Sequence, residues 1–363
     1  MDLLRCSTRV TGYGPFSTEE WIAHFPFSKE AREFLEQQGF SISTFFEFEN
    51  KVVERALERV RDAVEQGHVL SPSLESGFKY DFEVETLSYP VAIYLVASLG
   101  NRWLIERYAS AESKRVFACL QLKRYPAEAV LQLARGGLEW KWVTYDSVLK
   151  AFKVPVIKYV KYAVRIGGPA WKLVNQRVEE GVVLLSYEKF LRFISEGVRL
   201  RILERCSQPA PQLETDVYKK SIEYIRSLLS QTMKPIAPMP KSVDPEAFPP
   251  CIQQLMRSIE EGRHLPHAAR FFLASFLLRV GVKPDRVVEI FSRLPDFNRK
   301  RTEYYVRHIA GEKGGKKAYL PYSCERARSY GLCSMSDVCR QLQVQHPLQY
   351  YIRYRRAKRR ESE

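Results

Sequence analysis

Long apolar runs are missing from this 363-residue sequence. The two longest, at 91–99 and 271–278, are well short of the roughly 18 residues that a membrane-spanning helix requires. The N-terminal segment also lacks the apolar stretch and small residues of a secretory leader. We therefore expect a cytoplasmic protein, or a nuclear one if the source is eukaryotic, with no membrane partner. In a reducing compartment the seven cysteines are expected as thiols or metal ligands rather than disulfides.

Signatures of catalysis are missing too. The segment GEKGGKK at 311–317 is no Walker A loop, because its glycine spacing is one residue short and no Ser or Thr follows the lysines. Nucleotidyl transfer needs acidic residues that hold two metal ions roughly 4 Å apart. Asp81 and Glu83 alternate as on a strand, but no third acid completes such a set. The sequence therefore predicts a protein without an active site of its own.

Positive charge is abundant and unevenly placed. The formal net charge is +15; residues 251–363 contain 23 Lys and Arg against 11 Asp and Glu, whereas residues 1–250 contain 34 against 31. Six prolines crowd the segment 235–250, a density that neither a helix nor a central strand tolerates. We therefore predict a domain at 1–233 that contacts protein, a Pro-rich linker at 234–250, and a basic domain at 251–363 that contacts a polyanion.

Hydrophobic periodicity predicts a mainly α fold. In the first domain it predicts a helix from Val52 to Val64, two or three helices over 88–134, and a helix that Ser186 caps. Alternating residues at 140–143 and 182–185 predict strands of a small α/β part. The second domain is predicted to be all-helical, with helices that begin near positions 250, 266, 284 and 298.

Four cysteines of the basic domain form a candidate metal site. Cys251 is followed after 72 residues by Cys324, after 8 more by Cys333, and after 5 more by Cys339. Four soft thiolates suit a tetrahedral zinc ion or an iron–sulfur cluster. The spacing matches neither zinc ribbons nor ferredoxins, so it leaves the metal open, and scattered buried thiols remain the other interpretation. The other three cysteines are interpreted as core or incidental thiols: Cys6, Cys119 and Cys206.

Six strings around these cysteines occur in a fixed order: FPPCI at 248–252, EGRHLPHAARFFLASFLLRVG at 261–281, YYVRH at 304–308, YLPYSC at 319–324, GLCSMSDVC at 331–339 and HPLQYY at 346–351. In order and spacing they resemble the C-terminal domain of the large subunit of archaeal and eukaryotic DNA primases. The segment 87–113, LSYPVAIYLVASLGNRWLIERYASAES, is a weaker match to the helical part of that family's first domain.

This resemblance implies a function as well as a fold. It implies that Cys251, Cys324, Cys333 and Cys339 hold a [4Fe-4S] cluster, and it decides for iron over zinc. It also implies that catalysis belongs to a separate small subunit, on which the first domain docks. The C-terminal domain then binds single-stranded DNA template and RNA–DNA primer when synthesis starts. The alternative is an iron–sulfur or zinc-stabilised DNA-binding protein outside the primase complex, such as a helicase or nuclease accessory or a regulator.

One set of candidate nucleic-acid ligands lies around a predicted helix start. His264, His267 and Arg270 follow one another at three-residue steps across Pro266. The free N–H groups and the positive dipole end of a helix N-terminus favour phosphate, and an Arg can bind it through two hydrogen bonds. A purely structural helix start is the alternative interpretation.

A second set lies on one face of the last predicted helix, which begins near position 298, and in the loop after it. Tyr304, Arg307 and His308 are spaced for one helical face, on which a ring stacks on a base beside an Arg that pairs with phosphate. Lys316 and Lys317, in a glycine-rich loop, are candidate backbone contacts, with a plain solvated loop as the alternative.

Overall fold

The computed structural model describes residues 17–39, 41–48, 50–70, 81–232, 243–313 and 318–361. The chain divides into two compact units, Met1–Thr232 and Met233–Glu363. Most of the predicted linker, 234–242, lies outside the described residues. Within the described ranges, no helix is long and apolar enough to cross a membrane.

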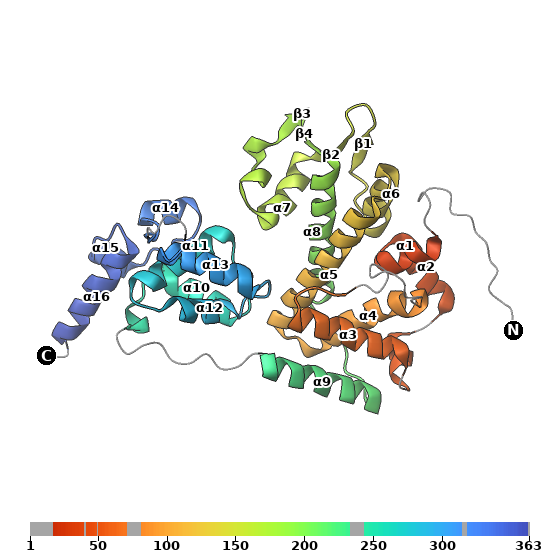
Figure 1. Ribbon diagram of the computed structural model, residues 1–363, viewed down its shortest axis with the longest axis horizontal. Helices are drawn as coiled ribbons and strands as arrows, with labels where there is room; N and C mark the ends of the chain where they lie inside the picture. Colours follow the sequence, from red (N-terminus) through yellow and green to blue (C-terminus); the bar gives the residue numbers. More distant parts are fainter. Residues whose placement is uncertain are drawn as a thin grey trace. The chain divides into compact units, whose positions relative to one another are not determined.

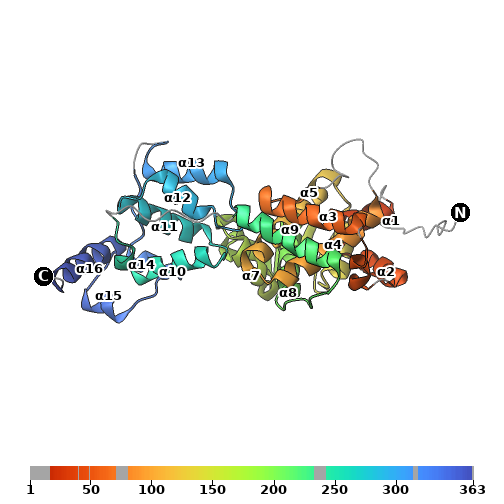
Figure 2. The same cartoon turned by 90° about the horizontal axis from the view of Figure 1, so that it is seen from below.

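The first unit is mainly helical and carries one small sheet, as predicted (Figure 1). Its described helices are α1 (Thr18–His24), α2 (Lys29–Gln38), α3 (Lys51–Glu65), α4 (Phe82–Leu99), α5 (Arg102–Lys123), α6 (Ala127–Gln132), α7 (Val156–Ile166), α8 (Tyr187–Arg205) and α9 (Asp216–Thr232). Short helical turns are η1 (Ile42–Phe46), η3 (Leu133–Gly137), η4 (Pro169–Trp171) and η5 (Leu173–Asn175). Figures 1 and 2 show α8 along α5, and α9 alongside α3.

The helices begin where the sequence offers side-chain caps. Asn50 Oδ1 accepts hydrogen bonds from the backbone N–H groups of Val52 and Val53, both at 3.0 Å. Ser186 caps α8 in the same way, as predicted. These caps satisfy donors that a helix start otherwise leaves unpaired. The helix predictions for 52–64 and 88–134 are confirmed.

A buried ion network joins α3, α4 and α5. Arg59 on α3 donates to Glu85 on α4 at 2.7 Å and to Glu112 on α5 at 2.6 Å. Arg115 donates to the second carboxylate oxygen of Glu112 at 2.9 Å. Burial alone would raise the pKa of Glu112, but the Arg59 and Arg115 charges outweigh burial and lower it to about 2.

The sheet has the order β1-β2-β4-β3 and is antiparallel throughout. Its strands are β1 (Thr144–Asp146), β2 (Ala151–Pro155), β3 (Arg177–Glu179) and β4 (Val182–Leu185). Phe152 lies opposite Leu185, and Val154 lies opposite Val183. These four side chains are buried, with α7 and α8 packed against β2 and β4. The prediction of a strand at 182–185 is therefore confirmed.

The strand predicted at 140–143 is misplaced, because β1 begins only at Thr144. Trp140 is buried without being part of the sheet. Its ring stacks on Trp142 with 5.1 Å between centroids, and its indole N–H donates to the Tyr162 hydroxyl at 3.1 Å. Gly197 on α8 makes room for it, because a Cβ there would lie 2.3 Å from the Trp140 ring. The alternating pattern at 140–143, which predicted a strand, thus reflects the aromatic packing of Trp140.

Asp81 and Glu83 lie at a helix start, not on a strand. Asp81 Oδ1 accepts hydrogen bonds from the N–H groups of Glu83 and Val84 at 3.1 and 3.2 Å, so it is the N-cap of α4. A capping carboxylate also interacts favourably with the helix dipole. The strand-like alternation of these two acids therefore does not reflect a strand, because two acids two positions apart fit a cap and first turn equally well.

The second unit is all-helical in its described part, as predicted. Its elements are η6 (Pro245–Ala247), α10 (Pro250–Glu260), α11 (His267–Arg279), α12 (Pro284–Phe291), α13 (Arg299–Ala310), α14 (Cys324–Ser329), α15 (Asp337–Gln341) and α16 (Pro347–Glu361). The central helix α11 is buried along most of its length and contacts α10, α12, α13 and α16. Such an all-round apolar helix forms the centre of a core.

The second unit begins before Cys251. Val243 and Phe248, inside the predicted linker 234–250, are buried in its core. The backbone N–H of Asp244 donates to the hydroxyl of Tyr351 on α16 at 3.1 Å. The predicted linker is therefore too long at its C-terminal end. Its last prolines start helices, where a missing N–H costs nothing.

Candidate nucleic-acid groove and cysteine cavity

A basic groove of about 900 Å³ lies between the start of α11 and helix α13. Four cationic side chains line it, against one carboxylate, that of Glu303. Its lining residues are His267, Arg270, Phe291, Lys300, Arg301, Thr302, Glu303, Tyr304, Tyr305 and Lys313. We call this feature the α11–α13 groove. It brings together residues from both predicted sets, namely His267, Arg270 and Tyr304.

Arg270 lies at one wall of the groove and is held from two sides. Its Nη2 donates to both oxygens of Asp296, at 2.8 and 2.7 Å, and its Nε donates to the Leu265 carbonyl at 2.7 Å. His264 completes the cluster, with its Nε2 3.4 Å from Asp296. Burial alone would raise the pKa of Asp296, but hydrogen bonds and charge from His264 and Arg270 hold it well below its usual value.

The N-terminus of α11 opens into the same groove. Pro266 is its N-cap and supplies no side-chain hydrogen bond, so the first-turn N–H groups lack a side-chain cap. The hydroxyl of Tyr305 lies 3.4 Å from His267 Nε2, and the two rings are 5.1 Å apart. Tyr305 packs against the core of the second unit and also contacts His267.

Tyr304 presents an accessible ring to the groove. Its side chain is 59% exposed, its ring is nearly parallel to that of His308, and the two centroids are 6.3 Å apart. The Lys313 ammonium group lies 5.5 Å from the Tyr304 ring centroid. His308 in turn lies 3.3 Å from the Tyr319 hydroxyl. An exposed ring beside ammonium groups is suited to stacking on a base.

Arg307 is engaged by three carboxylates. It pairs with Asp285 on α12 at 2.6 Å, with Glu303 at 3.2 Å, and with Glu312 at 2.7 Å. The hydrogen bonds to Glu312 and Glu303 raise its pKa. These pairs tie α13 to α12 and to the segment after α13. The structure therefore engages Arg307 in an ion-pair network, while the helical spacing of α13 keeps it on the face that it was predicted to share with Tyr304 and His308.

Sequence reasoning missed Lys300, Arg301 and Asp296. The two cations lie in the first turn of α13, and a charge-pattern scan of 298–301 would have found them. Asp296 is 26 positions from Arg270, and no local pattern links the two. Lys316 and Lys317 lie outside the described residues, as does Cys6.

The four candidate ligand cysteines line one cavity of about 330 Å³. Cys251 is in the first turn of α10, Cys324 begins α14, Cys339 is in α15, and Cys333 lies in the loop between α14 and α15. Ser336 caps α15, and its hydroxyl donates to Cys339 Sγ at 3.3 Å. Four chain segments thus bring four thiols to one place.

Among the described residues, no three His, Cys, Asp or Glu side chains are arranged to hold a metal ion. All four candidate donors in the cavity are thiols, the ligand type that zinc and iron–sulfur clusters take, and in a four-iron cluster each thiolate binds a different iron atom. The cavity also holds the cationic side chains of Arg328 and Arg340, which favour the anionic form of thiolate ligands.

Burial raises the pKa of Cys251 to about 12, and proximity to Cys333 and Cys324 adds to this effect. Burial, together with proximity to Cys333 and Cys339, also raises the pKa of Cys324. A cationic group bound among these thiols would favour their ionised form. Cys119 and Cys206 are buried in the first unit, as the prediction of core thiols requires.

Comparisons with known proteins give the class of this chain. Residues 241–351 match the family model for the C-terminal domain of the eukaryotic and archaeal DNA primase large subunit. The match covers the α11–α13 groove and all four cysteines of the cavity.

Full-length relatives extend the similarity to both units. The chain is 32% identical to the DNA primase large subunit PriL of Methanosarcina mazei, over 92% of this chain and 88% of that protein. It is 32% identical to that of Methanococcoides burtonii, over 92% and 91%, and 29% identical to that of Halobacterium salinarum, over 91% and 92%. The chain belongs to the DNA primase large-subunit family.

Proposed function

We propose that this chain is the regulatory large subunit of a DNA primase. It supports RNA primer synthesis at the start of DNA replication by binding a catalytic small subunit and by holding the single-stranded template and the 5′ end of the primer. The observation that carries this proposal is the α11–α13 groove, where His267, Arg270 and Tyr304 meet three further cations.

Each wall of the groove supplies a different contact. The open N-terminus of α11, with His267 and Arg270, suits the dense charge of a 5′ triphosphate, because backbone N–H groups and a guanidinium converge there. Tyr304 supplies a stacking surface for a base. Lys300 and Lys313 bind the backbone phosphates without reading sequence. His264, through Asp296, is a positioning residue for Arg270.

Arg307 and His308 act by shaping the groove. Arg307 fixes α13 against α12 through its three carboxylates, and His308 supports the ring of Tyr304 from behind. The basic loop with Lys316 and Lys317 follows directly on Lys313, and we assign it a backbone-contact role. The basic segment at 353–360 lies on α16 and adds nonspecific affinity.

We also propose that Cys251, Cys324, Cys333 and Cys339 hold a [4Fe-4S] cluster. When bound, the cluster supplies a covalent cross-link and a redox-active centre. The residues themselves come from α10, α14, the following loop and α15, so ligation joins the first helix of the unit to its C-terminal segments. The shared cavity and the all-thiol donor set support this assignment.

Docking of the small subunit is assigned to an apolar face of α7 in the first unit. Ile157 and Val164 are 79% and 73% exposed, and Val160 lies between them on the same helical face. A large subunit implies another subunit to which it binds. Single exposed apolar side chains are common on protein surfaces, whereas a stripe of them is not. Lys158 and Lys161 flank the stripe, so the matching partner surface would carry carboxylates.

Reconstitution of primer synthesis tests the proposal. The full chain, wild type or Tyr304→Ala, is combined with the catalytic small subunit on a single-stranded template. We expect the variant to lose most primer initiation and to keep extension of a long supplied primer, because the 5′ end is then remote from the growing end. Equal losses in both reactions would show that the groove serves neither the 5′ end nor initiation.

A further inference from the structure

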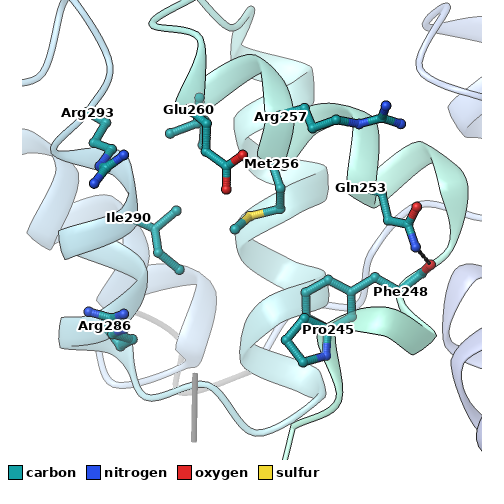
Figure 3. A pocket seen from close by; sticks show the side chains of 10 residues that line it. Pro245, Phe248, Gln253, Met256, Arg257, Glu260, Arg286, Ile290 and Arg293 are labelled. Carbon is teal, nitrogen blue, oxygen red and sulfur yellow. Dashed lines mark hydrogen bonds between the residues drawn. The ribbon is translucent and has the colours of Figure 1, made fainter. Parts of the chain in front are cut away.

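A third cavity, of about 480 Å³, lies between α10 and α12 in the second unit. Among the described residues it shares no lining side chain with the α11–α13 groove or the cysteine cavity. Figure 3 shows Met256 from α10 and Ile290 from α12 pointing toward one another, with the Glu260 carboxylate beside them. Arg286 and Arg293 lie on the α12 side. The cavity therefore has an apolar floor between helices and a cationic wall.

Two arginines of the cationic wall have a hydrogen-bond donor that no acceptor pairs with among the described residues. The Nε atoms of Arg286 and Arg293 are buried, and neither has a hydrogen-bond partner among the described residues. Arg286 pairs with Glu289 through another nitrogen, whereas the Arg293 guanidinium makes no ion pair in the described part of the chain. A buried donor left unpaired costs free energy, and the charge of the Arg293 guanidinium is not neutralised by an ion pair within the described residues, so the cavity favours an anionic ligand.

The floor distinguishes between kinds of anion. Phe248 is only 2% exposed, and its ring packs on Phe276 and Tyr351, so no aromatic face is free for a base. The negative charge of the Glu260 carboxylate repels a phosphate group, whereas its oxygens can accept hydrogen bonds from peptide N–H groups. An apolar slot between two helices, bordered by arginines, matches an amphipathic peptide with acidic flanks.

We propose that this cavity is a docking site for an acidic peptide segment of a partner protein. The partner inserts one bulky apolar side chain between Met256 and Ile290 and pairs its flanking carboxylates with Arg293 and Arg286. The charge complementarity of three arginines against one glutamate supports this occupant over a nucleic acid or a neutral peptide. The site is independent of the α11–α13 groove and adds a protein contact to the basic unit.

Selection of random peptides displayed on phage, against the immobilised full chain, tests this proposal. We expect the selected peptides to be rich in Asp and Glu around a Leu, Ile, Met or aromatic residue. Each peptide is labelled with fluorescein, and its affinity is measured by anisotropy. Arg293→Glu should weaken binding by about tenfold or more, because it removes one charge pair and adds a repulsion. Arg257→Glu, on the exposed rim of α10, should weaken it without disturbing the core.

Lys283→Glu is the matched control, since it reverses an exposed charge before α12 and lines none of the three cavities. It should bind the peptides like the wild type. Three outcomes overturn the proposal: no peptide is selected, the selected peptides bind Arg293→Glu and Arg257→Glu unchanged, or Arg293→Glu weakens single-stranded DNA binding as much as it weakens peptide binding. In the last case the arginines belong to the nucleic-acid surface.

Discussion

Arg270 and Asp296 form a two-oxygen ion pair, with Nη2 at 2.8 and 2.7 Å from the two carboxylate oxygens, at the wall of the α11–α13 groove. The pair orients the guanidinium and also competes with any anion for it. A phosphate that binds to Arg270 must therefore share the guanidinium with Asp296 or displace that carboxylate. Because of this competition, a change at Asp296 distinguishes whether Arg270 binds phosphate directly or only holds the fold.

The first prediction uses this ion pair. Arg270→Ala should weaken binding of a triphosphate-ended primer–template about ten- to a hundredfold, because a charge-assisted hydrogen bond contributes about 1.5–3 kcal/mol. The same duplex with a 5′ hydroxyl should lose much less. Asp296→Asn is the matched control, because it frees Arg270 from its carboxylate and should preserve or raise the affinity. If Asp296→Asn is as harmful as Arg270→Ala, Arg270 acts by holding the fold.

The second prediction concerns the salt dependence of binding. Lys300→Ala and Lys313→Ala should each weaken single-stranded DNA binding for all sequences, and each should reduce the slope of log K against log salt by about 1. Lys283 lies outside the groove, so Lys283→Ala should leave the slope unchanged. Slopes are measured by anisotropy titrations at several salt concentrations. An unchanged slope in both groove variants would place the phosphate path elsewhere.

Helices and caps were predictable because their signals are local. Asn50 and Ser186 cap helices in the structure as their positions in the sequence indicate. The strand assigned to 140–143 failed because Trp140 is buried by aromatic packing, which has no fixed period. The C-terminal end of the linker was predicted wrongly, because prolines at 249 and 250 can serve equally as linker residues and as the first residues of a helix.

The functional surfaces were predictable only in part. His267, Arg270 and Tyr304 stood out through helix position and residue type, and they do line one groove. Arg270's partner Asp296 and Arg307's partner Asp285 are distant in sequence, so their pairing depends on tertiary structure. The Arg307–Glu303 pair, one helical turn apart, was the only part of that network that spacing alone indicates.

The third prediction tests the cysteine cavity. Cys333→Ser should lower the iron content of the purified chain and destabilise the second unit, because ligation contributes folding energy. All five tryptophans lie at or before Trp171, so tryptophan fluorescence reports on the first unit, whose unfolding should not change. Cys206→Ala, a buried thiol of the first unit, should keep full iron content. Full iron occupancy in Cys333→Ser would remove Cys333 from the ligand set.

The fourth prediction concerns acid stability of the first unit. The folded pKa of Glu112 is about 2, below its ordinary value of 4.5, so its contribution to stability is complete above about pH 4.5 and is lost as pH falls toward 2. Arg59→Leu removes one of the two arginines that pair with each of the buried carboxylates Glu85 and Glu112, and it should cost about 3–5 kcal/mol at neutral pH. Urea unfolding followed by tryptophan fluorescence measures both effects. The loss in Arg59→Leu should shrink as pH approaches 2, and a pH-independent loss would assign it to packing alone.

The fifth prediction concerns the α7 face. Ile157 and Val164 expose apolar surface that the free first unit cannot cover within its described part, and burying a side chain of this size contributes about 1.5–3 kcal/mol. Ile157→Ser and Val164→Ser should each weaken binding of the catalytic small subunit about tenfold or more, measured by biolayer interferometry. Leu122, on α5, is also largely exposed, so Leu122→Ser is the control and should bind like the wild type. Because α7 packs on its other face against β2 and α8, these surface changes should not alter the unfolding of the unit. Unaltered affinity in both α7 variants would move the docking surface away from this helix, while a parallel loss in Leu122→Ser would point to a general effect on the first unit.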